Sequence, residues 1–189
     1  NMNFFRLTIL SIVSIVTLYA GEYKVDLSHS YVGFKIKHLM ISNVKGNFEN
    51  FSGKFTYDEE NKKLLTLDGK IDVNSINTSI AKRDKHLKSK DFFDVDKYPN
   101  ITFVSSKIKN DSVYGKLTMH GITKEVKLDY EFNGIIKGPR GKTKAGLSLS
   151  GKLNRKDFGL KYNSLLEAGG VAISDSVKLD LEFEAVLLK

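Results

Sequence analysis

Arg83, His86, Ser89 and Asp91 stand together in the stretch 81–106, and they are the residues best placed to do chemistry. Nucleophilic catalysis needs a serine hydroxyl within hydrogen-bond reach of a base, and an acid that orients the base. Ser89 follows His86 by three residues, on the same face of a predicted helix, and Asp91 is near. The trio allows a hydrolase, but the polar face of a surface helix offers such trios by chance. No GxSxG elbow supports the catalytic alternative.

Metal and nucleotide chemistry have less support. The four histidines, at positions 29, 38, 86 and 120, form no HxH or HxxxH pair, and the chain has no cysteine. A zinc site, a thiol nucleophile and a disulfide framework are therefore not expected. The Gly-rich loop from Gly134 to Gly141 has no helix pattern after it, so it does not predict a phosphate-binding loop.

A short helix is predicted to position the trio. One of the polar residues 77–79 can cap its start, and Ile80, Arg83 or Asp84, and Leu87 follow at the spacing of one helical face. We expect the helix to end by Phe93, before the Pro99 turn. Leu87, Phe92 and Phe93 would then plug the end of a core.

Most of the remaining chain alternates between apolar and polar residues, as antiparallel strands with one wet face do. Roughly eight such strands follow one another through turns, with no βαβ rhythm. A sheet of that many twisted strands closes into a barrel, which is either filled by its own side chains or holds one small ligand. The glycines inside these patterns fit barrel corners or a hollow interior, and they stand at positions 33, 53, 69, 115 and 151.

A second polar cluster, residues 155–159, follows the strand that ends at Leu153. It is expected to place Arg155 and Asp157 at the rim of the barrel. The alternative is an ordinary turn with an exposed ion pair, which would contribute about 0–1 kcal/mol to stability.

The first 20 residues have the layout of a secretory signal peptide. Arg6 gives a positive start, the uncharged run 7–18 follows, and the small residue Ala20 marks the expected cleavage point. The run is shorter than the roughly 20 residues of a spanning helix. We therefore expect residues 1–20 to be removed and residues 21–189 to form a single barrel domain. The alternative for the apolar run is a buried core helix or an uncleaved anchor. Asn1, which precedes Met2, is expected to be foreign to the natural chain.

The chain is basic, with a formal net charge of +8. Its lysines alternate along strands rather than cluster, so they fit solvated strand faces and nucleic-acid binding is not expected. Such a surface allows transient contact with an anionic membrane. The oligomeric state stays open, with a dimer as one option.

Several stretches, taken together and in order, resemble the YceI-like, polyisoprenoid-binding periplasmic proteins. Each motif alone is weakly specific, but the ordered set spans nearly all of the chain after residue 20. The matching stretches are 26–30 with 32–39, 44–48 with 51–53, 83–93, 98–103, 115–124 and 154–160.

The resemblance implies a mainly β fold, an eight-stranded antiparallel lipocalin-like barrel with a helix inserted between strands. It implies a periplasmic binding protein rather than an enzyme. The expected partner is an amphiphilic lipid, such as a polyisoprenoid, a prenyl quinone or a fatty-acid derivative, held in the barrel with its head near the mouth. No cofactor or metal is expected beside it.

The residues expected to bind this ligand are those that strand alternation points toward the interior, together with residues of the predicted helix segment and of the barrel opening. The polar candidates near the opening are His38, Arg83, His86, Arg155 and Asp157. The apolar candidates are Phe34, Ile36, Phe51, Phe55, Ile71, Phe92, Phe103, Leu117, Leu128, Tyr130, Leu149, Leu179 and Phe183. The alternative for the apolar group is a filled core. Two other functions stay open: the hydrolase, and a structural or interaction protein with a filled barrel.

Overall fold

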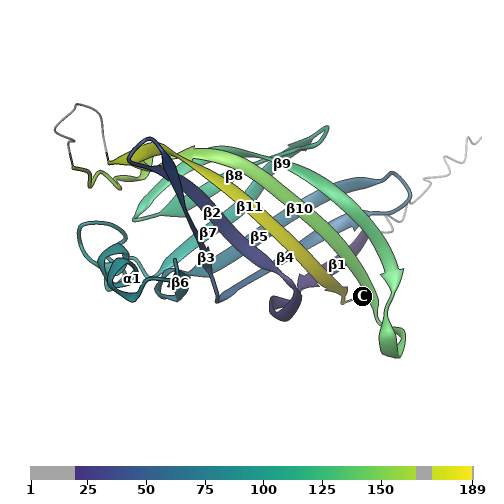
Figure 1. The fold of residues 1–189 in the computed structure, drawn as a ribbon. Coiled ribbons are helices and arrows are strands. Elements are labelled where there is room, and N and C mark those ends of the chain that lie inside the picture. The colour runs from purple at the N-terminus through teal and green to yellow at the C-terminus, as the bar shows by residue number, and fades with distance from the viewer. Residues whose placement is uncertain (1–19, 165–171, 189) are drawn as a thin grey trace, which may run out of the picture.

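The computed structural model describes residues 20–164 and 172–188 (Figure 1). The predicted leader therefore lies outside the described residues, apart from Ala20. The strands are β1 (Ala20–Val25), β2 (Tyr31–His38), β3 (Ser42–Phe48), β4 (Phe51–Asp58), β5 (Lys63–Asp72), β6 (Ile76–Asn77), β7 (Asn100–Lys109), β8 (Ser112–Met119), β9 (Ile122–Lys137), β10 (Thr143–Asn154) and β11 (Ile173–Leu187). One α-helix, α1 (Ala81–Lys88), and four 3₁₀ turns, η1 (Leu27–His29), η2 (Val73–Ser75), η3 (Pro139–Gly141) and η4 (Arg155–Phe158), complete these ranges. No helix in this part of the chain is long and apolar enough to cross a membrane.

The strands form a closed antiparallel barrel, which confirms the predicted fold. The ring runs β1-β4-β5-β7-β8-β9-β10-β11 and returns to β1. The strands β2, β3 and β6 continue β1, β4 and β5 toward one end of the barrel, because β2 pairs with β11 and β3, and β3 pairs with β6. Eight long strands, three of them interrupted, thus give the eleven segments.

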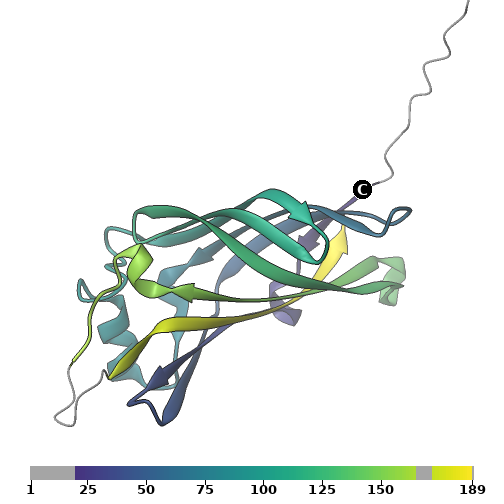
Figure 2. The same cartoon turned by 90° about the horizontal axis from the view of Figure 1, so that it is seen from above.

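Short polar side chains produce two of the interruptions. Asp26 accepts a hydrogen bond from the Ser28 amide and starts η1 between β1 and β2. Asp72 does the same with the Asn74 amide and starts η2 between β5 and β6. Such local bonds compete with the strand ladder and bend the chain. The barrel therefore opens at the β2–β3 end, and α1 lies there (Figures 1 and 2).

The start of α1 differs from the prediction. Its N-cap is Ile80, which makes no side-chain capping bond. Instead, the Thr78 amide and hydroxyl both donate to Asp84 in the first turns of the helix, which joins the segment before the helix to the helix itself. The helix ends at Lys88, and tight turns continue the cap to Phe93.

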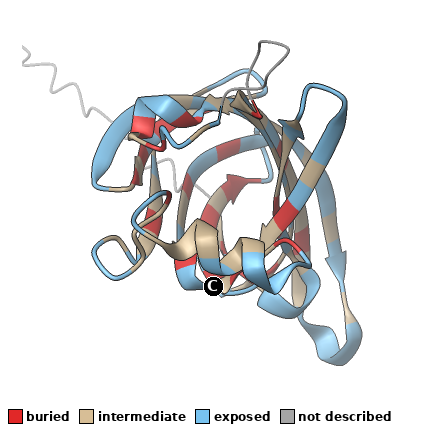
Figure 3. Ribbon diagram, turned by 60° about the vertical axis from the view of Figure 1, so that its left-hand side comes forward, coloured by how far each residue is buried: buried red, intermediate tan, exposed pale blue. Residues whose placement is uncertain are grey.

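Two apolar clusters fill the barrel unequally. At the closed end, Tyr23 stacks on Phe55 with ring centroids 5.2 Å apart, and Tyr57 stacks on Phe132 at 3.5 Å. Leu147 is fully buried in the same cluster. A second cluster lies toward α1, and many of its members, such as Phe48, Phe51 and Leu117, border empty space inside the barrel. Figure 3, which brings the α1 end forward, shows the helix across this opening. The barrel is thus filled at one end and less densely packed at the other.

Candidate functional site

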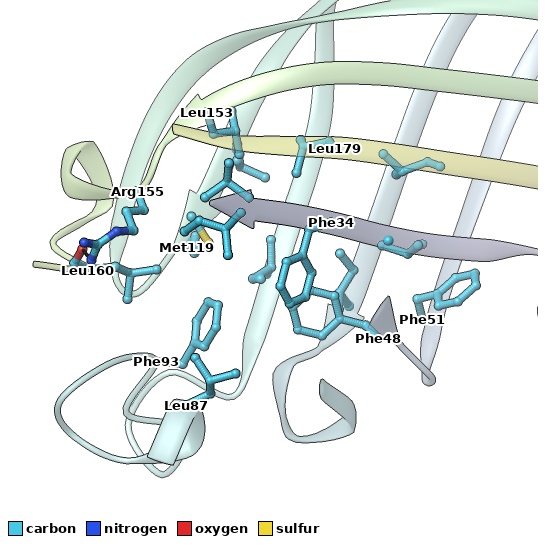
Figure 4. Close-up of a pocket in the computed structure, with 18 of the residues that line it drawn as sticks. Phe34, Phe48, Phe51, Leu87, Phe93, Met119, Leu153, Arg155, Leu160 and Leu179 are labelled. Carbon is cyan, nitrogen blue, oxygen red and sulfur yellow. Dashed lines mark hydrogen bonds between the residues drawn. The ribbon is translucent and has the colours of Figure 1, made fainter. Parts of the chain in front are cut away.

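A cavity of about 440 Å³ occupies the α1 end of the barrel, within the size range of ligand pockets. Its wall is made of inward-facing aromatic and aliphatic side chains from the strands (Figure 4). Phe34 and Leu179 face each other across the neighbouring strands β2 and β11, Phe48 comes from β3, and Met119 comes from β8. Strand alternation produces this wall, because every second residue points inward. The part of the barrel under α1 is therefore hollow and apolar.

The segment with α1 covers the cavity mouth. Leu87 and Phe93 point toward the cavity, and Phe93 meets Phe48 edge to face with centroids 6.2 Å apart. Phe92 is buried and packs against Tyr162 at 4.9 Å, on the segment after η4. The prediction that Leu87, Phe92 and Phe93 close the end of the core is confirmed.

Arg83 and Thr78 hold this cover in place. The Arg83 Nε donates to the Thr78 hydroxyl oxygen and an Nη donates to the Thr78 carbonyl, both at 2.7 Å. Asp84 accepts from the Thr78 hydroxyl in turn. Arg83 also lines the cavity, so its guanidinium serves the cover and borders the mouth.

The structure does not assemble a catalytic triad from His86, Ser89 and Asp91. His86 Nε2 lies 3.0 Å from the Asp91 carboxylate, but the Ser89 hydroxyl donates to the His86 backbone carbonyl at 2.7 Å. The serine therefore ends the helix and does not face the imidazole. His86 instead packs edge-on against Phe92 and Tyr162, with centroids 5.1 and 4.8 Å away.

Arg155 lines the cavity rim, but backbone carbonyls occupy its guanidinium. It is only 3% exposed, and it donates to the carbonyls of Leu160 at 2.6 Å, Tyr162 at 2.8 Å and Ser174 at 2.9 Å. Burial lowers the pKa of the guanidinium, and Asp175, 3.7 Å away, opposes that shift. Arg155 thus joins the segments on either side of the 165–171 range, rather than offering donors to a ligand.

The structure brings together all but three of the residues predicted to bind ligand. Phe55 and Tyr130 belong to the filled end of the barrel. They were wrongly included because alternation predicts which face of a strand a residue is on, and not how far along the barrel axis it lies. Asp157 is exposed on η4 and does not pair with Arg155, whose carboxylate partner is Asp175. The cavity is lined by the others: Phe34, Ile36, His38, Phe51, Ile71, Arg83, His86, Phe92, Phe103, Leu117, Leu128, Leu149, Arg155, Leu179 and Phe183.

Sequence reasoning left several wall residues out of the predicted set. Met119 and Leu153 continue the inward parity of Leu117 and Leu149, so alternation alone could have selected them. Phe48 was not among the predicted wall residues, and its inward position depends on the β2–β3 pairing.

Comparisons with known proteins agree with this architecture. A family model described as the YceI-like domain matches residues 23–185. A UPF0312 protein of Staphylococcus aureus (strain MSSA476) is 41% identical over 160 residues, which cover 84% of this chain and 94% of that protein. The crystal structure of a Campylobacter jejuni YceI protein is 40% identical and superposes with a TM-score of 0.69, covering 82% of this chain and 91% of that one.

More distant structures share the fold. Burkholderia cenocepacia BcnA is 23% identical with a TM-score of 0.71, and the match covers 85% of this chain and 98% of that one. A polyisoprenoid-binding domain from Saccharophagus degradans is 16% identical with a TM-score of 0.62, covering 87% of this chain and 98% of that one.

Proposed function

The chain belongs to the YceI-like family, and from that premise we propose that it holds a long-chain isoprenoid, or a similar amphiphilic lipid, inside its barrel. The observation that carries the proposal is the apolar cavity of about 440 Å³ beneath α1. The name of the Saccharophagus degradans domain, which shares the fold, points to the isoprenoid class. The protein would act as a carrier in the periplasm, after removal of the leader predicted at residues 1–20.

The cavity wall suits a ligand whose binding depends on the length of its hydrocarbon chain. Each buried methylene contributes about 0.8 kcal/mol to binding, so a chain of isoprene units needs few polar contacts. The wall around Phe34, Phe51, Phe103 and Leu179 supplies apolar surface. The filled end, closed by Tyr23 and Phe55, sets how deep such a chain could reach.

The polar head of the ligand would lie at the mouth, beside α1. His38, Arg83 and His86 border the cavity there. Within residues 20–164 and 172–188, Arg83 hydrogen-bonds to Thr78 through Nε and one Nη, and its other Nη would serve an acceptor on the ligand. Arg155 would not take this role, since four backbone carbonyls already accept from its donors.

Mass spectrometry of an organic extract of the purified protein tests the proposal directly. We expect a prenyl or long-chain lipid in the extract, and uptake of a prenyl quinone or a fatty-acid derivative by protein that has been stripped of lipid. A clean extract together with no uptake of either probe would overturn the proposal. The Gly69→Leu variant gives the matched comparison, because its added side chain narrows the cavity itself.

A further inference from the structure

Four lysines stand in register across the outside of the barrel. Lys45 pairs with Lys35 across β3 and β2, Lys35 with Lys178 across β2 and β11, and Lys178 with Lys152 across β11 and β10. Neighbouring strands lie about 4.8 Å apart, so this lysine row extends over roughly 14 Å. The alternate residues of the same strands, such as Phe34 and Leu179, line the cavity. The row therefore points away from the cavity, into solvent.

The lysine row carries uncompensated charge. None of its four ammonium groups pairs with a carboxylate of residues 20–164 or 172–188. The stretch 27–48, which includes the whole β2–β3 hairpin, contains no acidic residue. Like charges directly opposite each other destabilise a sheet. An anionic surface laid against the row would remove that repulsion.

The turn of the same hairpin exposes an apolar tip, defined here as Leu39, Met40 and Ile41. These side chains are 38%, 58% and 88% exposed. Leu39 and Met40 have φ of 50° and 63°, a left-handed conformation that glycine or asparagine adopts at lower cost. The turn thus presents apolar side chains at positions where a polar turn would fold more easily.

The apolar tip lies at the cavity mouth. The residues just before it, Ile36, Lys37 and His38, line the cavity, as do Arg83 and His86 of α1. Figures 1 and 2 both place the β2–β3 turn and α1 at the same end of the barrel. The helix adds exposed Lys82 and Lys85 on this end, and Ile80 before it is 51% exposed. Asp91, Asp94 and Asp96 follow on the loop to β7, where Asp91 pairs with His86.

We propose that the mouth of the barrel docks on an anionic phospholipid bilayer, with the apolar tip in the interface and the lysine row and α1 lysines against the headgroups. Apolar side chains beside lysines are the combination that binds such surfaces. A soluble polyanion would meet the lysines but leave the apolar tip in water. A twofold dimer through this face would set each lysine row against its own copy. The inference deepens the proposed function by naming where lipid is collected, but its test requires no bound lipid.

Vesicle co-sedimentation tests the docking surface. Vesicles of phosphatidylcholine alone are compared with vesicles of phosphatidylcholine mixed with phosphatidylglycerol, and binding is expected only to the second. Changing Lys35→Gln and Lys178→Gln should lower the partition coefficient roughly five-fold for each lysine. The matched control, Lys62→Gln with Lys63→Gln, removes the same charge from the β4–β5 turn at the closed end. All variants are used without the predicted leader, whose apolar run 7–18 would itself bind both vesicle types.

Fluorescence tests the apolar tip independently. The chain contains no tryptophan, so Ile41→Trp introduces a single reporter. Its emission should shift to the blue with the anionic vesicles, while Ile136→Trp, at a residue 66% exposed beside the β9–β10 turn, should not shift.

Equal binding of both vesicle types, or no effect of the Lys35 and Lys178 changes, would overturn the inference. The inference would also be overturned if the protein did not bind vesicles and instead formed a dimer in sedimentation equilibrium that the Ile41→Ser change dissociates. Lipid found in the extract without vesicle binding would leave the proposed function standing and remove only the docking surface.

Discussion

Gly53 and Gly69 pair directly across β4 and β5, on the inward side of both strands, and together they hollow the cavity wall. A Cβ on Gly69 would meet only the Ser52 carbonyl oxygen, at 3.6 Å. Neither glycine has a left-handed φ, but a Cβ on Gly53 would come within 3.1 Å of the Asp68 carbonyl oxygen, so only Gly69 has room for a side chain. What this pair supplies is space for a ligand, and not a turn.

Gly69→Leu is therefore expected to fill the cavity while the barrel stays folded. The added side chain enters empty space next to Phe103, so the free energy of unfolding should change by less than about 1 kcal/mol. Lipid uptake, measured by displacement of a fluorescent fatty-acid analogue, should fall at least ten-fold.

Gly69→Ala is the control, because its methyl group leaves most of the cavity free. Its uptake should remain near that of the natural protein. Equal uptake by the Leu and Ala variants would mean that ligand does not reach β4 and β5.

Thr78→Val should loosen the cover without changing its shape. Thr78 is 4% exposed, and its hydroxyl both donates to Asp84 and accepts from Arg83. Valine keeps the volume but removes the hydroxyl partner of both charged groups, which retain only their bonds to the backbone of residue 78, at a cost of about 1–3 kcal/mol. We expect a lower urea midpoint and faster release of a bound fluorescent lipid.

Thr66→Val is the matched control for this change, since the Thr66 hydroxyl bonds to that of Thr56 on the exposed face of the barrel. Its effect on stability should stay within about 0.5 kcal/mol. If both valine variants release lipid at the natural rate, the Thr78 network does not control the cover.

The strands were predictable because alternation is a local property of the sequence. Phe34, Ile36 and Leu179 alternate with lysine or aspartate, and that pattern alone places them on the inner face. The height of a residue along the barrel is not local. Phe55 shares its parity with Phe51, yet it stacks on Tyr23 in the filled end, because the register between β1 and β4 decides the level at which it sits.

Polar roles were harder to predict for the same reason. Arg155 looked like a ligand-head partner, but its acceptors are carbonyls on segments up to 19 residues away. Thr78 was a predicted helix cap, but its hydroxyl donates to Asp84 and accepts from Arg83 instead of capping the helix. Sequence spacing identifies donors and acceptors, whereas only the fold decides which of them meet.

Arg155→Leu should destabilise the barrel rim strongly. The change leaves the carbonyls of Leu160, Tyr162 and Ser174 without their donor in a buried setting, so unfolding should become easier by about 2–4 kcal/mol. Denaturant unfolding measures the loss. Lys156→Ala is the control, because exposed Lys156 pairs with the same Asp175 at 3.0 Å and contributes at most about 1 kcal/mol. Similar losses in both variants would show that Asp175, and not the carbonyls, is the important partner.

Tyr23 should make the barrel sensitive to alkali. Its side chain is fully buried against Phe55, and its hydroxyl donates to Glu59 at 3.2 Å. Burial, and then the negative charge of Glu59, raises the pKa of Tyr23 from 10.0 to about 12. The unfolded chain therefore loses this proton at lower pH than the folded one. The resulting stability is fully present below pH 10 and is lost as pH rises toward 12.

Tyr23→Phe keeps the ring stack on Phe55 and removes the ionisable group. Unfolding free energies measured by urea across the alkaline range should fall less steeply in this variant than in the natural protein. At neutral pH the two should differ by only about 1 kcal/mol, the net value of one hydrogen bond. Some alkaline loss should persist, because burial also raises the pKa values of Tyr57 and Tyr130. Identical slopes in the two proteins would show that the Tyr23 hydroxyl ionises as readily in the folded barrel as in the unfolded chain.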